Sequence, residues 1–344
     1  MKLQAGPRNL ITDIAGLHVG NTDDPVLKSG VTAVICEQPA VASVMVLGGA
    51  PGTRETDLLE PHNTVETINA LVLSGGSAFG LDAASGVQAA LREKGIGFQV
   101  GGYTIPIVPA AILFDLKNGG DKDWGRYPPY RDLGYEAALR AEPDFAIGSA
   151  GAGTGALVAG LKGGLGSAST VLPSGVTIGA LAAVNAVGAV TVAATRHFWA
   201  APFEIGQEFG GLGFPSPLPE GTAKVRLKFR DTADAADLAA RNTTIAVIAT
   251  DAVLGKAAAK RLAVSAHDGF ARAIWPSHTP MDGDLVFALA TGGSGIALSG
   301  DDTIDFFAAA AATMARAIAR GVHAATPAAN DLFPTWSTRF PASA

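Results

Sequence analysis

The segment 241–250 constrains the fold more than any other part of the chain. A polar approach ends at Asn242 and Thr243, and the run that follows, residues 245–250, is apolar and rich in β-branched side chains. Such a continuous run predicts a strand that is buried on both faces. The chain must therefore fold so that Asn242 and Thr243 stand at the mouth of a buried strand.

The Asn242–Thr243 bond suits a chain that cuts itself. The Thr243 hydroxyl would attack the Asn242 carbonyl carbon to form an ester, and water would then release a new amino-terminal threonine. Its α-amine, with a reference pKa of about 7.7–8.0, can take the proton from its own hydroxyl. The tripeptide Asn242-Thr243-Thr244 also fits an N-glycosylation acceptor or an ordinary loop-to-strand junction, so three interpretations stay open at this point.

Composition narrows the class of protein. The 344 residues are 48% hydrophobic and 16% charged, which provides material for a large core in one or two domains. The net charge is -6 and lysine and arginine form no cluster, so nucleic acid and anionic membranes are disfavoured as partners. We expect a small or neutral substrate.

Cysteine usage and the amino terminus bear on the compartment. Cys36 is the only cysteine, so no disulfide can form within the chain. Residues 1–7 lack the apolar region of a signal peptide, and no uninterrupted apolar run reaches about 18 residues. These features predict a cytoplasmic enzyme, in which glycosylation at Asn242 is disfavoured.

Periodicity and turn residues predict both strands and helices along the chain. Short β-branched runs indicate strands, and longer periodic or alanine-rich runs indicate helices. The expected strands span 31–36, 41–47, 176–184, 188–195, 225–229, 245–250 and 285–291, the expected helices span 252–274 and 303–320, and a strand, glycine turn and helix follow one another over 71–94.

Two glycine-rich turns are candidates for ligand binding. The turn Gly75-Gly76-Ser77 can hold an anion or a carbonyl oxygen on its N–H groups, although close packing of helix on strand needs the same glycines. The segment 151–156 fits the dinucleotide pattern G-x-G-x-x-A, but no acidic residue between Asp144 and Glu204 is present to hold a ribose. Lys162 precedes a glycine, which fails the Walker pattern. No nucleotide cofactor is therefore expected.

Two polar residues stand out among small apolar ones. Lys162 is the one charged residue between Ala150 and Arg196. It can extend its ammonium to water, or it can supply a fixed positive charge beside a nucleophile. Asn185 lies at the corner between two predicted strands, where turn chemistry and an oxyanion donor are alternative roles.

Asp282 and Asp284 precede a predicted strand and are separated by one glycine. In an extended segment both side chains point to the same side. The pair could grip an ammonium group, orient a hydroxyl or bind a metal, and a solvated turn is the alternative. Metal is disfavoured because the histidines show no H-x-H or H-E-x-x-H spacing and His278 is the only one close by.

These motifs together resemble the self-processing aminopeptidase family. That family includes the L-aminopeptidase/D-esterases, the β-peptidyl aminopeptidases and the nylon-oligomer (6-aminohexanoate oligomer) hydrolases. The resemblance covers nearly the whole chain, and the order and spacing of the motifs make it specific. The matching motifs are Gly52-Thr53-Arg54-Glu55-Thr56-Asp57, Gly75-Gly76-Ser77-Ala78-Phe79-Gly80-Leu81, Val184-Asn185-Ala186-Val187-Gly188, Asn242-Thr243-Thr244 and Met281-Asp282-Gly283-Asp284.

The resemblance implies a fold and an assembly. The family fold is a four-layer αββα sandwich of the N-terminal-nucleophile hydrolase type, within the α/β (α+β) class. It implies a single domain, 1–344, that cuts itself into an α subunit, 1–242, and a β subunit, 243–344. It also implies that the cleaved protomers associate as homo-oligomers, with a homotetramer expected here.

The resemblance also implies roles for the candidate residues. Thr243 matches the nucleophile, Lys162 the active-site lysine, and Asn185 an oxyanion-stabilising asparagine. Asp282 and Asp284 match the acidic pair that positions the nucleophile. A positive charge at Lys162 would lower the pKa of the freed α-amine and keep it competent as a base.

The chain departs from the family at one position. Phe114 stands where several relatives carry a tyrosine, so it has no hydroxyl to offer to substrate. With Gly75, Gly76 and Ser77 it completes the expected substrate-binding set. The Asp282-Gly283-Asp284 motif resembles the nylon-hydrolase branch more than the β-peptidyl branch.

The sequence therefore predicts a self-cleaving hydrolase of linear amides or peptides that needs no cofactor or metal. A nucleotide-binding oxidoreductase and a non-catalytic small-molecule-binding protein are the alternatives. The preferred acyl group is left open.

Overall fold

A long bent sheet forms the centre of the computed structural model, which describes residues 3–230 and 242–341. Among these residues nine strands join in the order β10-β11-β12-β13-β2-β4-β7-β3, with β1 beside β2. The strands are β1 (Leu17–Asp24), β2 (Ser29–Val46), β3 (Thr53–Arg54), β4 (Thr67–Ser74), β7 (Ala110–Ile112), β10 (Gly164–Val171), β11 (Thr177–Asn185), β12 (Thr243–Thr250) and β13 (Leu285–Ala290).

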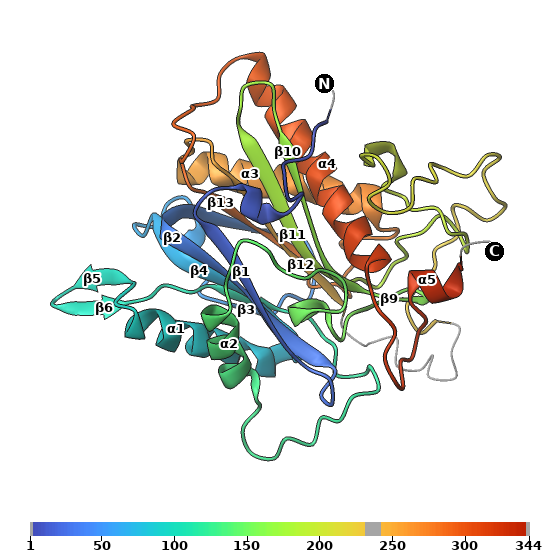
Figure 1. Cartoon of the computed structure of the whole chain (residues 1–344), viewed down its shortest axis with the longest axis horizontal. Helices are drawn as coiled ribbons and strands as arrows, with labels where there is room; N and C mark the ends of the chain where they lie inside the picture. The colour runs from blue at the N-terminus through green and yellow to red at the C-terminus, as the bar shows by residue number, and fades with distance from the viewer. Residues whose placement is uncertain (1–2, 231–241, 342–344) are drawn as a thin grey trace.

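Helices cover the sheet on two sides (Figure 1). Short strands pair in two hairpins outside it. The helices are α1 (Ala83–Glu93), α2 (Tyr130–Leu139), α3 (Lys256–Ala273), α4 (Asp301–His323) and α5 (Trp336–Arg339), and the hairpins are β5 (Phe98–Val100) with β6 (Tyr103–Ile105) and β8 (Leu157–Val158) with β9 (Leu161–Lys162).

The sheet is folded onto itself through β2. The register of β2 shifts between Ile35 and Ala40. Residues before the shift pair with β1 and β4, and residues after it pair with β13 and, at Ala40 and Val41, again with β4. An inner core joins the two halves, with Leu71 of β4 and Val247 of β12 in the same apolar cluster. Separate clusters join α1 and α2 to one half and α3 and α4 to the other. These layers make the expected αββα sandwich.

Strand β12 shows why the run 245–250 is apolar throughout. Ile245, Val247 and Ala249 belong to the inner core between the two halves of the sheet. Ala246 and Ile248 belong to the core under α3 and α4. Successive side chains of a strand point to opposite faces, so a strand between two cores needs apolar residues at every position.

Several predicted elements are confirmed and two are wrong. The strands 245–250 and 285–291 and the helices 252–274 and 303–320 correspond to β12, β13, α3 and α4, and 31–36 and 41–47 are parts of β2. The expected strand 188–195 makes only isolated bridges at Ala189 and Thr191. The expected strand 225–229 is irregular over 225–227 and then turns, with Phe229 at φ +64. Buried irregular segments share the β-branched composition of strands, so periodicity does not separate them.

The dinucleotide-like segment is a packing feature. Gly151–Gly153 is a single 3-10 turn rather than the start of a long helix. Gly151 has φ +48, and a Cβ there would lie 2.3 Å from the side-chain oxygens of both Asn21 and Thr32. The glycine therefore allows the turn to lie against β1 and β2.

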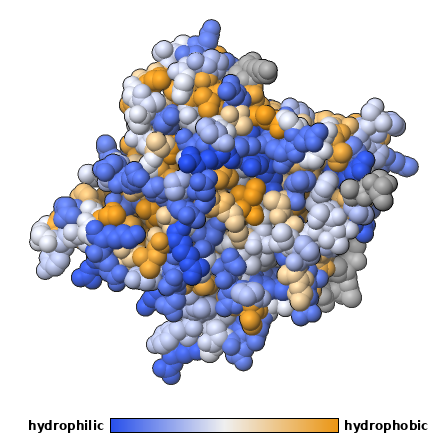
Figure 2. All heavy atoms as spheres, in the orientation of Figure 1, coloured by the Kyte–Doolittle hydropathy of each residue, from blue (hydrophilic) through white to orange (hydrophobic). Residues whose placement is uncertain are grey.

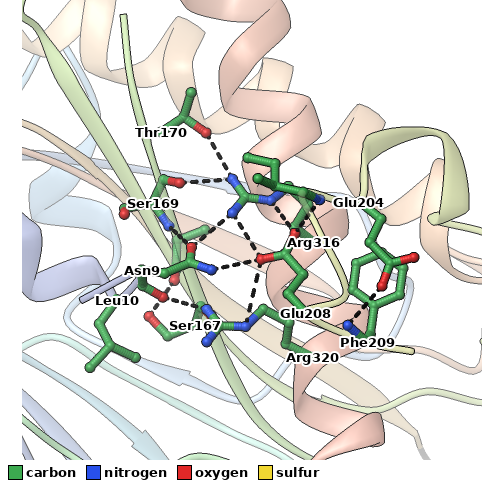
Figure 3. A network of polar contacts seen from close by, with 12 residues as sticks. Asn9, Leu10, Ser167, Ser169, Thr170, Glu204, Glu208, Phe209, Arg316 and Arg320 are labelled. Carbon is green, nitrogen blue, oxygen red and sulfur yellow. Dashed lines mark hydrogen bonds and ion pairs between the residues drawn. The ribbon is translucent and has the colours of Figure 1, made fainter. Parts of the chain in front are cut away.

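A buried arginine ties α4 to distant parts of the chain (Figure 3). Arg316 is fully buried and its Nε and Nη2 donate to the Glu208 carboxylate at 2.6 and 2.9 Å. Its remaining N–H groups donate to Ser169 O at 2.7 Å, Thr170 Oγ1 at 3.0 Å and Asn9 Oδ1 at 2.8 Å. All five donors of the guanidinium are thus used. We call these five residues the arginine cluster.

The surface is mixed in character. On the face drawn in Figure 2, hydrophilic residues predominate and hydrophobic ones are interspersed among them. Among the described residues, no helix combines the length and the apolar composition needed to cross a bilayer.

Candidate functional site

Three segments bring the predicted catalytic residues together at one end of β12. Thr243, the first residue of β12, pairs in register with Asn185, the last residue of β11. Asn242 forms a parallel bridge with Asp282. We call Asn185, Asn242, Thr243, Asp282 and Asp284 the threonine site. All five are at most 4% exposed.

The Thr243 hydroxyl lies against the bond that it is predicted to cut. Its Oγ1 donates to the carbonyl oxygen of Asn242 at 2.6 Å. The same carbonyl oxygen accepts the backbone N–H of Gly283 at 2.8 Å. A donor on this oxygen stabilises the negative charge that develops when a nucleophile attacks the carbonyl carbon. Sequence reasoning missed this donor because a backbone N–H has no residue signature.

Gly283 has to be a glycine in this position. A Cβ there would lie 2.6 Å from Ala50 O and 2.7 Å from the Oγ1 of Thr243. These separations are shorter than van der Waals contact, so a side chain would displace the hydroxyl or the loop. The glycine between the two aspartates therefore sets the approach of the loop to Thr243.

Asp282 is held by backbone and hydroxyl donors. Its Oδ1 accepts Val187 N at 3.2 Å, and its Oδ2 accepts Thr279 N at 3.1 Å and Thr279 Oγ1 at 2.7 Å. Burial and the charge of Asp284 raise the pKa of Asp282. A carboxyl group with a raised pKa can accept and return a proton near neutral pH.

Asp284 contacts the chain on the other side of Thr243. Its Oδ1 accepts Thr244 N at 2.8 Å, and its Oδ2 accepts both the backbone N–H and the Nδ1 of His278, at 3.0 and 2.9 Å. The structure thus brings both predicted aspartates to the threonine. The neighbouring His278, singled out by the sequence only for its proximity, is a direct partner.

Asn185 is oriented by its surroundings. Its Oδ1 accepts Leu157 N at 2.9 Å and its Nδ2 donates to the carbonyl oxygen of Phe114, also at 2.9 Å. Phe114 therefore reaches the site through its backbone and lines a small cavity shared with Asn185 and Asn242. The Asn185 amide is thus held in place beside the start of β12 by hydrogen bonds within the protein, and its role as an oxyanion donor stays a prediction.

Lys228 lines this cavity together with Lys117, and sequence reasoning missed its contact with Asn185. Its Nζ donates to Oδ1 of Asn185 at 2.9 Å and to the backbone O of the same residue at 3.2 Å. Burial lowers the pKa of Lys228 to about 7, against the opposing charges of Asp282 and Asp115. The sequence shows only a lysine within a run predicted as a strand, which gives no signal of this role.

Lys162 makes its contacts elsewhere. Its Nζ donates to both carboxylate oxygens of Asp331, at 3.2 and 3.0 Å, and to Thr326 O at 3.0 Å. The Asp331 carboxylate also pairs with Lys28 at 2.9 Å. The structure therefore does not bring the Lys162 ammonium into the threonine site, and the role implied by the resemblance stays a prediction.

The turn Gly75-Gly76-Ser77 contacts Asp115, a buried acid that lines the same cavity. Gly76 has φ +83 and its N–H donates to Asp115 Oδ1 at 2.7 Å. The N–H groups of Gly75 and Ser77 donate to Gly30 O and Leu113 O, each at 2.9 Å. All three N–H groups are thus bonded within the protein, which favours packing over direct ligand binding. Asp115 lines the cavity, a role that the sequence did not indicate.

Within 3–230 and 242–341, no group of three or more histidine, cysteine or acidic side chains is arranged to hold a metal ion.

Comparisons with known proteins point to one family. The model of peptidase family S58 matches residues 9–331. A protein named as an uncharacterized aminopeptidase of Mycobacterium tuberculosis (strain ATCC 25618 / H37Rv) is 44% identical over 351 residues, which cover 97% of this chain and 98% of the relative. The 6-aminohexanoate-oligomer endohydrolase of Kocuria sp. (strain KY2) is 28% identical over 83% of this chain and 76% of its own length.

Solved structures support the fold. The L-aminopeptidase D-Ala-esterase/amidase of Ochrobactrum anthropi, described as a variant of the Ntn hydrolase fold, superposes with a TM-score of 0.68. The match covers 94% of this chain and 88% of that chain at 22% identity. A Burkholderia sp. β-aminopeptidase gives the same TM-score and identity.

Proposed function

The chain belongs to peptidase family S58 and is an amide-bond hydrolase, and we propose that it cuts its own Asn242–Thr243 bond and then uses Thr243 as its nucleophile. The observation that carries this proposal is the pair of hydrogen bonds on Asn242 O. The Thr243 hydroxyl lies 2.6 Å from that oxygen, and Gly283 N lies 2.8 Å from it. The nucleophile and an oxyanion donor thus meet at one carbonyl.

Self-cleavage proceeds through an ester. The Thr243 oxygen forms a bond to the Asn242 carbonyl carbon, the C–N bond breaks, and the released nitrogen takes up the proton from the hydroxyl. Water then hydrolyses the ester, which leaves a carboxylate on Asn242 and a free amine and hydroxyl on Thr243. Gly283 N stabilises the oxyanion in both steps.

Turnover repeats this chemistry on a substrate. The freed α-amine takes the proton from the Thr243 hydroxyl, the oxygen attacks the substrate carbonyl, and the leaving amine receives the proton. Water then hydrolyses the acyl-enzyme. Asn185 donates to the substrate oxyanion, and the buried carboxylates of Asp282 and Asp284 hold the amine in place.

The proposed substrates are small linear amides or peptides. The similarity to an aminopeptidase and to a 6-aminohexanoate-oligomer endohydrolase supports this class. Amino-acyl p-nitroanilides and 6-aminohexanoate oligomers should be assayed together. Failure of the fully cleaved protein on both classes would remove the substrate proposal. We further propose homotetramers of cleaved protomers, which sedimentation would test.

The cleavage itself is tested with two neighbouring hydroxyls. Thr243→Val removes the nucleophile and should leave one band on a denaturing gel and no hydrolysis. Thr244→Val is the matched control, because the described part of the structure records no hydrogen-bond partner for the buried Thr244 hydroxyl. The control should be cleaved into fragments of 242 and 102 residues, the latter being 344 minus 242.

Sequencing of the small fragment decides the position of the cut. Its amino terminus should begin Thr-Thr-Ile-Ala-Val. Thr243→Ser keeps a hydroxyl and should retain partial cleavage. A wild-type protein that stays at full length and is nevertheless fully active would contradict the mechanism.

A further inference from the structure

A chain of close polar contacts runs from the threonine site into the interior through two histidines. Asp284 Oδ2 lies 2.9 Å from His278 Nδ1, and His278 Nε2 lies 3.3 Å from His267 Nδ1. His267 Nε2 lies 2.9 Å from the carbonyl oxygen of Met45. His267 comes from α3 and is 2% exposed. The proposed mechanism uses neither histidine.

The protons in this series of hydrogen bonds can be assigned one by one, starting from the carbonyl oxygen of Met45. The carbonyl oxygen of Met45 can only accept, so His267 Nε2 carries a proton. A neutral His267 then has an unprotonated Nδ1, which must accept from a protonated Nε2 of His278. Burial lowers the pKa of His267 to about 4, which keeps this residue neutral at pH 7.

At the other end of this series, the contact with Asp284 requires a second proton on His278. Asp284 accepts backbone N–H groups from Thr244 at 2.8 Å and from His278 at 3.0 Å. Hydrogen bonds from N–H groups favour the ionised carboxylate. An ionised Asp284 has no proton to give, so His278 Nδ1 must donate to it. These contacts favour a proton on each of the two ring nitrogens of His278.

The backbone of His278 is strained in a way that serves this contact. His278 has φ +55, a left-handed conformation that non-glycine residues rarely adopt. In this conformation its N–H and its Nδ1 both reach Asp284 Oδ2. One residue thus binds one carboxylate oxygen through backbone and side chain together.

We propose that His278 is a positioning residue whose imidazolium keeps Asp284 ionised and fixed beside Thr243. In this arrangement His267 Nδ1 accepts the hydrogen bond from His278 Nε2 and so holds the charged ring in place. This inference rests on the proposed function, in which Thr243 is the nucleophile. It also separates the roles of the two carboxylates, because Asp284 has its own counter-charge and Asp282 is left to exchange a proton.

The charge on His278 has a direct spectroscopic signature. The uncut Thr243→Val chain and the wild type are labelled with 15N in the histidine rings, and signals from the six histidines are assigned with His278→Asn and His267→Gln. At pH 7 we expect two protonated ring nitrogens on His278, and one protonated and one unprotonated nitrogen on His267. An unprotonated ring nitrogen on His278 in both proteins would overturn the inference.

Kinetics of the cleaved enzyme test the consequence. His278→Asn retains a short N–H donor but removes the charge, and we expect kcat to fall by about tenfold or more with KM changed by less than about threefold, as for residues that orient a catalytic group. The exposed His62→Asn is the matched control and should behave as wild type. Wild-type kcat in His278→Asn would overturn the positioning role.

The second histidine provides a test that does not depend on removing His278. Gln at position 267 can donate to Met45 O and accept from His278, whereas Leu can do neither. His267→Gln should therefore keep several times more activity than His267→Leu. Equal kcat values in two folded variants would contradict the role of His267. Failure of the proposed function is distinguishable, because it appears as an uncut or inactive wild type whatever the charge of His278.

Discussion

The threonine site and the arginine cluster are both buried polar groups that join residues before position 242 to residues after it, but their charges are arranged in opposite ways. In the arginine cluster, Arg316 meets Glu208 of opposite sign (Figure 3). In the threonine site, two carboxylates of the same sign, Asp282 and Asp284, share one loop. Burial of a carboxyl group therefore has different consequences in the two places.

The titration of the two acids shows the difference. Burial alone would raise the pKa of Glu208, but the hydrogen bonds and charge of Arg316 outweigh it and hold the pKa below its usual value. Burial and the charge of Asp284 both raise the pKa of Asp282. Paired charges give a fixed structural contact, whereas like charges leave a group that can exchange protons.

Breaking the arginine cluster should have the largest effect on stability. Arg316→Met removes the two hydrogen bonds that Arg316 donates to the Glu208 carboxylate and leaves it the longer ion pair with Arg320 at 3.8 Å, and loss of one member of a buried pair costs about 3–5 kcal/mol. The measurement is thermal unfolding in the uncut Thr243→Val background. Adding Glu208→Gln should recover part of the loss. An unchanged melting temperature in Arg316→Met would show that the cluster is not a stabilising contact.

Gly283→Ala should have the next largest effect, on chemistry rather than on stability. The added methyl group would meet the Thr243 hydroxyl at 2.7 Å. Because loss of an oxyanion donor or of its alignment costs about 10²–10³ in rate, cleavage should slow by that order. Gly255→Ala is the control, since a Cβ there meets nothing within 4 Å. Equal cleavage rates on a time-resolved gel would contradict the close approach.

The sequence predicted much of the fold and part of the site. Strand β12 and the threonine at its start were visible because a two-sided buried strand has a continuous apolar signature. Asp282 and Asp284 were visible because they lie in one short motif. Lys228 was not, because its contact with Asn185 joins residues 43 positions apart and depends on how an irregular segment packs. The approach to the cut, residues 231–241, lies outside the described residues.

The buried Lys228 beside the threonine site should make the stability of the protein depend on pH. Its pKa is lowered to about 7 by burial, so between pH 7 and its ordinary value near 10.5 the unfolded chain holds a proton that the folded chain has released. Stability therefore rises with pH across this window and is lost as pH falls toward 7. We expect the melting temperature of the Thr243→Val chain to rise by roughly 1–2 °C per kcal/mol of this linkage, because the unfolding entropy of a chain of 344 residues is large.

Two variants isolate that contribution. Lys228→Met should flatten the dependence between pH 7 and 9.5, whereas Lys224→Met, at an exposed position of the same segment, should preserve it. In an otherwise wild-type chain, Lys228→Met should also slow self-cleavage by about tenfold if the ammonium orients Asn185. The same pH slope in both variants would place the linked proton on another group.

Of these substitutions, Lys162→Met should change stability and turnover the least. Its ammonium pairs with Asp331, whose pKa is lowered by Lys28 and Lys162 against the raising effect of burial. Lys28 still neutralises Asp331 when Lys162 is removed, so the loss should be about 1–3 kcal/mol, the contribution of hydrogen bonds to a charged group. This is less than the loss expected for Arg316, because Asp331 keeps a close ion pair with Lys28 at 2.9 Å, whereas the ion pair that Glu208 keeps is the longer one with Arg320, at 3.8 Å. We expect kcat of the cleaved enzyme to stay within about threefold of wild type.

Lys28→Met removes the other cation from the same carboxylate and is the matched control. If Lys162→Met abolished turnover while Lys28→Met did not, the role implied by the family resemblance would stand, and the contact with Asp331 would have to be exchanged for one with the threonine site during the reaction.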